Sequence, residues 1–207
     1  MQPFDPLHQC TDEELLNSFR KGRTEVFGIL VRRYQREIYS YLRRYLGDAN
    51  LADDVFQNTF LQVYLKADQY EMGRPFRPWL YTIAFHQAID ALRRHGRHPA
   101  VSLDQISGSD HQANETPSSL ADLLESRETD PFENLELEEK RQLIRGAVDQ
   151  LPDFLKQVVI LAYYQGLKYK EVAEILDIPV GTVKSRLHTA IAKLYDLWKD
   201  SPTLPRV

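Results

Sequence analysis

The chain has 207 residues, enough for one domain or two small ones, and its 43% hydrophobic and 27% charged residues are typical of a protein with a packed core. Its single cysteine, Cys10, excludes an internal disulfide framework and a multi-cysteine zinc site. The N-terminus has neither a basic start nor an apolar run, and no apolar stretch approaches membrane-spanning length, so we expect a cytoplasmic protein without a signal peptide.

Charge is unevenly distributed along the chain, although the net charge is only −4. Residues 1–98 carry a net charge of +2, residues 99–140 a net charge of −9, and residues 141–207 a net charge of +3. Residues 99–135 also lack apolar periodicity and are rich in Ser, Asp, Glu, Gly, Pro and Asn. We therefore expect two helical domains, 1–98 and 136–207, joined by a flexible acidic linker at 99–135.

Apolar residues at three- and four-residue spacing predict four helices in the N-terminal domain. The first helix follows a capping box that begins at Thr11, with Leu15, Leu16 and Phe19 as its apolar stripe. Thr24 is expected to cap the second helix. That helix should end at Gly47, because glycine accepts the left-handed backbone found at many helix C-termini.

An acidic pair, Asp53 and Asp54, opens the third predicted helix, at about 51–67. In its first turn, carboxylates suit the positive end of the helix dipole. The pair is either a charged helix end or an acidic contact for a basic partner. Pro78 is expected to open the fourth helix, since a missing amide hydrogen costs little at that position.

Aromatic and arginine residues alternate from Tyr70 to Arg97. Such a surface suits unpaired bases, which stack on rings while phosphates pair with guanidinium groups. Phe76, Tyr81 and Phe85 are the rings expected near the arginines, whereas Trp79 can pack inward. Aromatic residues are also common in helical cores, and composition alone favours the core interpretation.

Residues 166–198 have the pattern of a helix-turn-helix. Two amphipathic helices are separated at residues 177–179, where Pro179 has no amide hydrogen to continue the first helix. The outward face of the second helix places short hydrogen-bonding side chains between basic ones, as a helix in a DNA major groove requires. An ordinary packed helical hairpin is the alternative. The buried face is expected to contain Val183, Leu187, Ala190, Ile191 and Leu194.

In order and spacing, these segments resemble the extracytoplasmic-function (ECF) group of bacterial sigma factors, within the sigma-70 family. The resemblance spans nearly the whole chain and implies an all-α fold, with a four-helix region 2 module, an acidic linker and a helix-turn-helix region 4 module. It rests on residues 53–60 (DDVFQNTF), 74–84 (RPFRPWLYTIA), 90–94 (DALRR), 151–152 (LP), 166–173 (GLKYKEVA) and 178–187 (IPVGTVKSRL).

The resemblance implies a factor that binds core RNA polymerase, at its clamp coiled coil and flap, and directs promoter recognition, melting and transcription initiation. It implies no catalytic residues and no cofactor, because the polymerase performs the chemistry. The implied partners are core polymerase, promoter DNA and, as is usual for the group, an anti-sigma factor, without membrane insertion. Polymerase binding would fall to Asp53, Asp54, Gln57 and Phe60.

Promoter contacts are implied for two further sets of residues. The downstream element would be melted and held by Arg74, Phe76, Arg77, Trp79, Tyr81, Phe85, His86, Arg93, Arg94 and Arg97. The upstream duplex element would be bound by Lys168, Tyr169, Thr182, Lys184, Ser185, Arg186, His188 and Thr189. Among these, Lys184, Ser185, His188 and Thr189 are candidates for base edges, and Lys168, Thr182 and Arg186 for phosphates, which fix register rather than sequence. The acidic linker would either follow a positively charged polymerase channel as an RNA mimic or serve as a tether.

Three positions depart from the family pattern: His86 replaces a usual Asn in the pocket for a flipped base, Lys168 a helix-capping Ser or Thr, and Ala162 a DNA-contacting arginine of some members. Two other functions are open. A free-standing helix-turn-helix repressor or activator would leave residues 53–97 without a purpose. A metal-dependent nuclease would need a metal at Asp53, Asp54 and Asp90, with which no further ligand converges in sequence.

Overall fold

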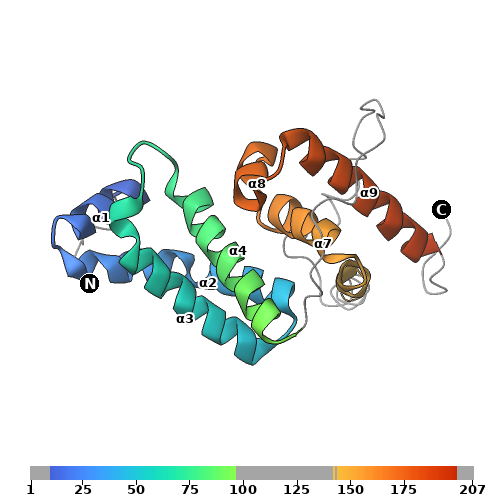
Figure 1. Cartoon of the computed structure of the whole chain (residues 1–207), viewed down its shortest axis with the longest axis horizontal. Helices are drawn as coiled ribbons and strands as arrows, with labels where there is room; N and C mark the ends of the chain where they lie inside the picture. The colour runs from blue at the N-terminus through green and yellow to red at the C-terminus, as the bar shows by residue number, and fades with distance from the viewer. Residues whose placement is uncertain (1–9, 97–141, 143, 200–207) are drawn as a thin grey trace, which may run out of the picture. The chain divides into compact units, whose positions relative to one another are not determined.

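A computed structural model of the chain describes residues 10–96, 142 and 144–199, with the side chains of 198 and 199 excepted. Within these ranges every regular element is a helix (Figure 1), which confirms the predicted all-α fold. The predicted linker at 99–135 and the candidate Arg97 lie outside the described residues.

The chain forms two compact units. One contains helices α1 to α4 and also residues 170–179, and the other contains the remaining elements of the C-terminal part. The predicted boundaries, 1–98 and 136–207, differ from this division in the placement of residues 170–179, and the domain limits stay a prediction.

Helix α1 (Asp12–Arg20) begins at the predicted capping box. The Thr11 hydroxyl accepts the Glu14 amide hydrogen at 3.2 Å, and the Glu14 carboxylate accepts that of Thr11 at 2.8 Å. The stripe of Leu15, Leu16 and Phe19 is buried, as predicted. The sequence pattern therefore located both the start of this helix and its packed face.

Helix α2 (Phe27–Leu46) starts later than the predicted cap. The prediction for Thr24 was wrong, because Thr24–Val26 form a short 3-10 turn, η2, and the N-cap residue of α2 is Val26, which makes no side-chain capping bond. The Thr24 carbonyl accepts the Phe27 amide instead, so this residue lies inside the helical turn. The predicted end is confirmed: Gly47 has a φ of 72° and its amide bonds to the Arg43 carbonyl.

Helix α3 (Ala49–Leu65) begins two residues before the prediction because Asp48 caps it. The Asp48 carboxylate accepts the Leu51 amide hydrogen at 3.1 Å. Asp53 and Asp54 therefore lie in the second turn, not the first, and the helix dipole does not explain them. A 3-10 turn, η3 (Ala67–Gln69), follows α3.

Helix α4 (Phe76–Arg94) starts two residues before Pro78, which corrects the prediction that proline opens it. Pro78 still lies in the first turn, where an amide has no partner within the helix. Helices α2, α3 and α4 pack against one another (Figure 1). Their largest fully buried side chains include Ile38, Tyr41, Phe76, Leu80 and Tyr81.

In the C-terminal part, residues 144–149 are helical, and α7 (Asp153–Val159) continues into a π-helical segment, η4 (Ile160–Tyr164). Gly166, with a φ of 61°, follows as the predicted stop. Helix α9 (Val180–Lys199) packs against α7. Its predicted apolar face is buried at Val183, Leu187, Ala190 and Leu194, and half-buried at Ile191.

A sharp turn separates α8 (Tyr169–Leu176) from α9. Asp177 adopts a φ of 52°, the Ile178 amide bonds to the Ala173 carbonyl at 3.0 Å, and the Asp177 amide bonds to the Glu174 carbonyl at 3.4 Å. This pair of bonds is a Schellman C-cap. The first helix of the predicted helix-turn-helix is thus ended by Asp177, before Pro179 is reached.

Candidate polymerase and nucleic-acid interfaces

The outer face of α3 carries most of the residues predicted to bind polymerase. Asp53, Asp54 and Gln57 are exposed. Phe60 is only 6% exposed, and its ring lies 5.0 Å from that of Phe56. Phe60 therefore supports this face from the core and is not placed to contact a partner, which corrects its predicted role.

The two carboxylates of the acidic pair have different surroundings. The Tyr39 hydroxyl, on α2, is hydrogen-bonded to Asp53; burial raises the pKa of Tyr39, and the bond to the carboxylate raises it further. The Tyr39 ring also meets Phe56 edge-on at 6.2 Å. The Asp53 side chain is thus oriented by a residue of α2. Asp54 is the next residue of α3, so its side chain points in a different direction around the helix axis and is exposed.

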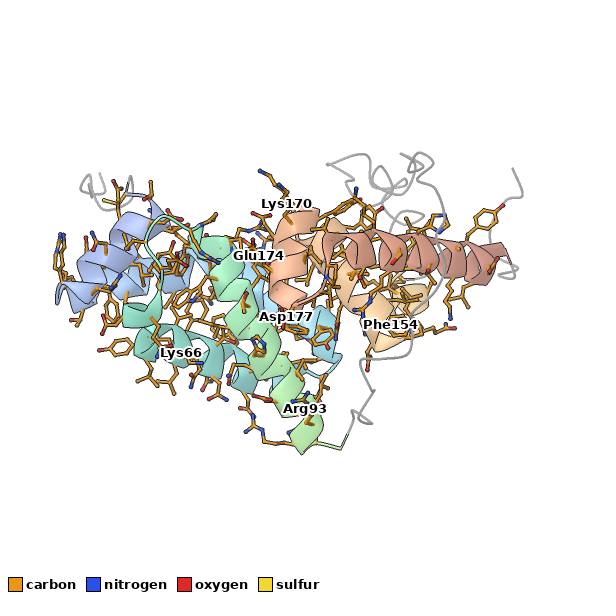
Figure 2. The ribbon with its side chains drawn as sticks, turned by 45° about the horizontal axis from the view of Figure 1, so that its top comes forward. Lys66, Arg93, Phe154, Lys170, Glu174 and Asp177 are labelled. Atoms are coloured by element: carbon orange, nitrogen blue, oxygen red, sulfur yellow. The ribbon has the colours of Figure 1, made fainter. Side chains whose placement is uncertain are left out.

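An apolar ridge that sequence reasoning missed continues this face towards the C-terminal end of α3, near Lys66 (Figure 2). Leu61, Tyr64 and Leu65 are 52%, 45% and 61% exposed. The ring of Tyr64 contacts Phe19 and Phe27 at 4.8 and 5.3 Å, so its position is fixed. The sequence feature that could have predicted this ridge is helical spacing, because residues 54, 57, 61 and 65 are three or four positions apart and so share one face of the helix.

Two of the aromatic residues predicted to hold a melted strand belong to the core instead. Phe76 and Tyr81 are fully buried, so the prediction that they contact bases was wrong for both. Phe76 packs on Tyr34 and Trp79, and Tyr81 packs on Tyr41. Residues of α4 face packed neighbours on more than one side, so its apolar spacing alone does not reveal which rings are exposed.

Arg77 is held in an intramolecular network. Its Nε and Nη2 atoms both lie 2.7 Å from Glu37 Oε1, and the Tyr81 hydroxyl donates to the same oxygen at 2.8 Å. Burial raises the pKa of Tyr81 well above its ordinary value, and the neighbouring Glu37 carboxylate adds to this. A phosphate contact by Arg77, as predicted, would therefore compete with the Arg77–Glu37 ion pair, which connects α4 to α2.

The remaining predicted residues of this segment lie at the surface. Trp79 and Phe85 are half-buried, and His86 is exposed with its Nδ1 donating to the Thr82 carbonyl at 2.8 Å. This bond leaves Nε2 as the nitrogen that can meet a ligand. The basic residues Arg74, Arg93 and Arg94 are exposed, and Arg93 marks the end of α4 in Figure 2. Arg74 pairs with Glu71 at 2.7 Å and Arg93 with Asp90 at 3.8 Å.

The polar face of α9 is accessible, as predicted. Lys184, Ser185, His188 and Thr189 are exposed, and Thr182 is half-buried. The hydroxyls of Ser185 and Thr189 donate to the carbonyls of Thr182 and Ser185 at 3.1 and 3.0 Å. Their lone pairs therefore face outward as acceptors for the amino groups of bases.

Arg186 differs from its neighbours, because its guanidinium lies 5.6 Å from the centre of the Phe154 ring on α7. Burial lowers its pKa from the ordinary value. The side chain is half-buried and stacked, so only part of it is available to a phosphate.

Helix α8 completes the candidate DNA-binding set. Lys168 is exposed just before it and Tyr169 is half-buried in its first turn. Lys170 and Glu174 lie on its exposed face, and the exposed Asp177 follows its last residue (Figure 2). Ala162 lies half-buried within η4.

Two negative findings concern the described residues. In the described ranges, no group of three His, Cys, Asp or Glu side chains is arranged to hold a metal ion. None of the helices described is both long and apolar enough to cross a membrane.

Comparison with known proteins places both parts of the chain in one family. The model of Sigma-70 region 2 matches residues 30–98, and that of Sigma-70, region 4 matches residues 141–194. The ECF RNA polymerase sigma-E factors of Escherichia coli K12 and Salmonella typhimurium LT2 are each 34% identical over 184 residues, covering 88% of this chain and 91% of theirs. That of Haemophilus influenzae is 33% identical, covering 88% and 92%.

Solved structures share the fold. CnrH, solved with the cytosolic domain of CnrY, superposes with a TM-score of 0.63 at 24% identity, covering 92% of this chain and 99% of that one. The sigma factor RpoE of Bartonella quintana, solved with the anti-sigma factor NepR, gives 0.59 at 21% identity, covering 84% and 98%. The chain therefore belongs to the ECF group of the sigma-70 family of RNA polymerase sigma factors.

Proposed function

We propose that this chain directs transcription initiation by binding core RNA polymerase through α3, holding a melted promoter strand on α4 and its preceding loop, and binding an upstream duplex element with α9. The observation that supports this is the presence of both sigma regions in one chain. A repressor that used only a helix-turn-helix would leave the exposed face of α3 without a partner. The polymerase would supply the chemistry, and the site of action would be the cytoplasm.

The α3 face suits a large basic partner. Asp54 and Gln57 supply polar contacts, and Leu61 and Leu65 supply apolar area on the same stripe. Energetically important contacts in protein interfaces cluster around apolar anchors, and charges at the rim steer association. We expect the clamp coiled coil of core polymerase to bind along this stripe.

The surface of α4 suits unpaired bases. Trp79, Phe85 and His86 remain accessible after Phe76 and Tyr81 are assigned to the core. Stacking contributes about 1–3 kcal/mol per base, which offsets much of the cost of unpairing. The exposed Arg93 and Arg94 can pair with phosphates in the same region.

An anti-sigma factor is the expected regulator. Two of the structural neighbours were solved with a partner, the cytosolic domain of CnrY and the anti-sigma factor NepR. The exposed ridge of Leu61, Tyr64 and Leu65 is a surface that such a partner would cover, because exposed apolar side chains at helical spacing favour protein contacts. Covering it would block polymerase binding.

The test is run-off transcription with sigma-free core polymerase on a library of promoter fragments. We expect discrete start sites with the wild-type chain and at least a tenfold loss with Asp54→Arg, since charge reversal in an interface costs about 2–5 kcal/mol. Asp196→Arg, the same charge change at an exposed residue of α9, should retain binding to core polymerase. Absence of initiation on every template would contradict the proposal.

A further inference from the structure

The N-terminus of α4 is capped by a residue of another helix. Its N-cap residue, Pro75, makes no side-chain capping bond. The Phe76 amide instead donates to Glu13 Oε1 of α1 at 2.8 Å, across 63 positions of sequence. Because Phe76 is fully buried, water has little access to this amide. Glu13 therefore supplies an acceptor that the segment before α4 lacks.

The carboxylate of Glu13 lies at the first turns of two helices. It belongs to the first turn of α1, where Asp12 and Glu14 are also found. It also meets the first amide of α4. Helix N-termini carry partial positive charge, so both helices stabilise a negative group at this position. The neutral side chain of glutamine would keep an acceptor but lose this charge.

Side chains at both ends of helix α1 form hydrogen bonds with other segments of the N-terminal unit. Asp12 accepts from Arg33 Nη1 and from the Tyr34 hydroxyl, each at 2.6 Å, which ties the start of α1 to α2. At the other end, Arg20 donates to the carbonyls of Asp68 and Tyr70, each at 3.4 Å. Figure 1 shows α1 beside the connection between α3 and α4. Helix α1 is thus hydrogen-bonded to both ends of the segment 68–76, through Arg20 at one end and Glu13 at the other.

We propose that Glu13 is a positioning residue for promoter opening, which holds the first turn of α4 and the loop at 71–75 in the geometry that receives the melted strand. This rests on the proposed function of α4. The loop carries the exposed Arg74, and the first turn carries the half-buried Trp79 one step after Pro78. A shift of the first turn would move both groups relative to the strand they hold.

The experiment compares Glu13→Ala, Glu13→Gln and Glu14→Ala in the full chain bound to core polymerase. Glu14→Ala is the matched control, because it removes one carboxylate from the same turn of α1 without a bond to α4. The readouts are core affinity, permanganate reactivity of thymines in the opened promoter, and hydrogen exchange of the peptide that contains Phe76.

Glu13→Ala should open the promoter about tenfold more slowly than wild type and expose the Phe76 amide to exchange, with core affinity unchanged. Glu13→Gln should open the promoter only about threefold more slowly than wild type, since its amide oxygen still accepts a hydrogen bond. Glu14→Ala should open the promoter within twofold of wild type. If Glu13→Ala does not fold, Glu13→Gln is compared with Glu14→Gln on the same readouts.

Normal opening by Glu13→Ala would overturn the proposal, even if the Phe76 amide exchanges faster. An equal loss with Glu14→Ala would also overturn it, because the effect would then follow from the charge or stability of α1. Failure of the wild-type chain to open any promoter would instead refute the proposed function of α4, and faster exchange in Glu13→Ala would still establish the cap.

Discussion

Replacing Tyr81 by Phe tests the structural role that the buried hydroxyl of this residue has in the N-terminal unit. The substitution keeps the ring and removes only the hydroxyl, which donates to Glu37 at 2.8 Å in a fully buried position. Hydrogen bonds to charged groups contribute about 1.5–3 kcal/mol. The Glu37 side chain is 30% exposed and keeps its ion pair with Arg77, so we expect a loss of about 1–2 kcal/mol.

The assay is urea unfolding of the full chain followed by tryptophan fluorescence. Trp79 and Trp198 are its two tryptophans, so a Trp198→Phe background makes Trp79 report on the N-terminal unit alone. Each kcal/mol of stability that is lost lowers the melting temperature of a unit of 60–100 residues by about 4–8 °C. Affinity of the holoenzyme for a single-stranded downstream element should stay within twofold. Unchanged stability would refute the assignment of the Tyr81 hydroxyl to a stabilising buried hydrogen bond with Glu37.

Three further predictions concern backbone, pH and DNA binding. Gly47→Ala should destabilise the N-terminal unit by about 1–2 kcal/mol, because its φ of 72° disfavours a Cβ. Gly28→Ala, inside α2 with ordinary contact to Arg32, should stabilise by about 0.5–1 kcal/mol, and equal effects in urea unfolding would contradict this account. Burial, helped by nearby carboxylates, raises the pKa of Tyr70 to about 12. Stability from the neutral phenol is therefore present below pH ~10 and lost as the pH rises towards 12, and Tyr70→Phe should flatten this decline in unfolding curves. Lys168→Ala should lower the salt slope of upstream-element binding by about 0.9 without changing base preference, and an unchanged slope would exclude a phosphate contact.

Local patterns predicted the helices and several of their ends well. The capping box at Thr11 and the stop at Gly47 depend on neighbouring residues only, so the sequence contains the whole signal. The start of α3 was missed because Asp48 precedes the apolar period, which was used to place the helix. The cap itself, an Asp before a helical stretch, is an ordinary sequence signal.

Tertiary contacts account for the parts that could not be predicted. Phe76, Tyr81 and Phe85 are all aromatic residues in the same arginine-rich segment. Only the packing of α4 against its neighbours distinguishes the buried rings of Phe76 and Tyr81 from the accessible ring of Phe85. The bond from Phe76 to Glu13 joins residues that no local pattern connects. The apolar ridge from Leu61 was visible as helical spacing but was not distinguished from core positions.

We expect this chain to open promoters only as a subunit of RNA polymerase. The most direct measurement is permanganate footprinting of one promoter fragment with the chain alone, core polymerase alone, and both together. Reactive thymines near the start site are expected only when both are present, and the chain alone should bind duplex DNA weakly. Tight and specific protection of the duplex by the chain alone, without opening when core polymerase is added, would contradict a sigma function and favour a repressor.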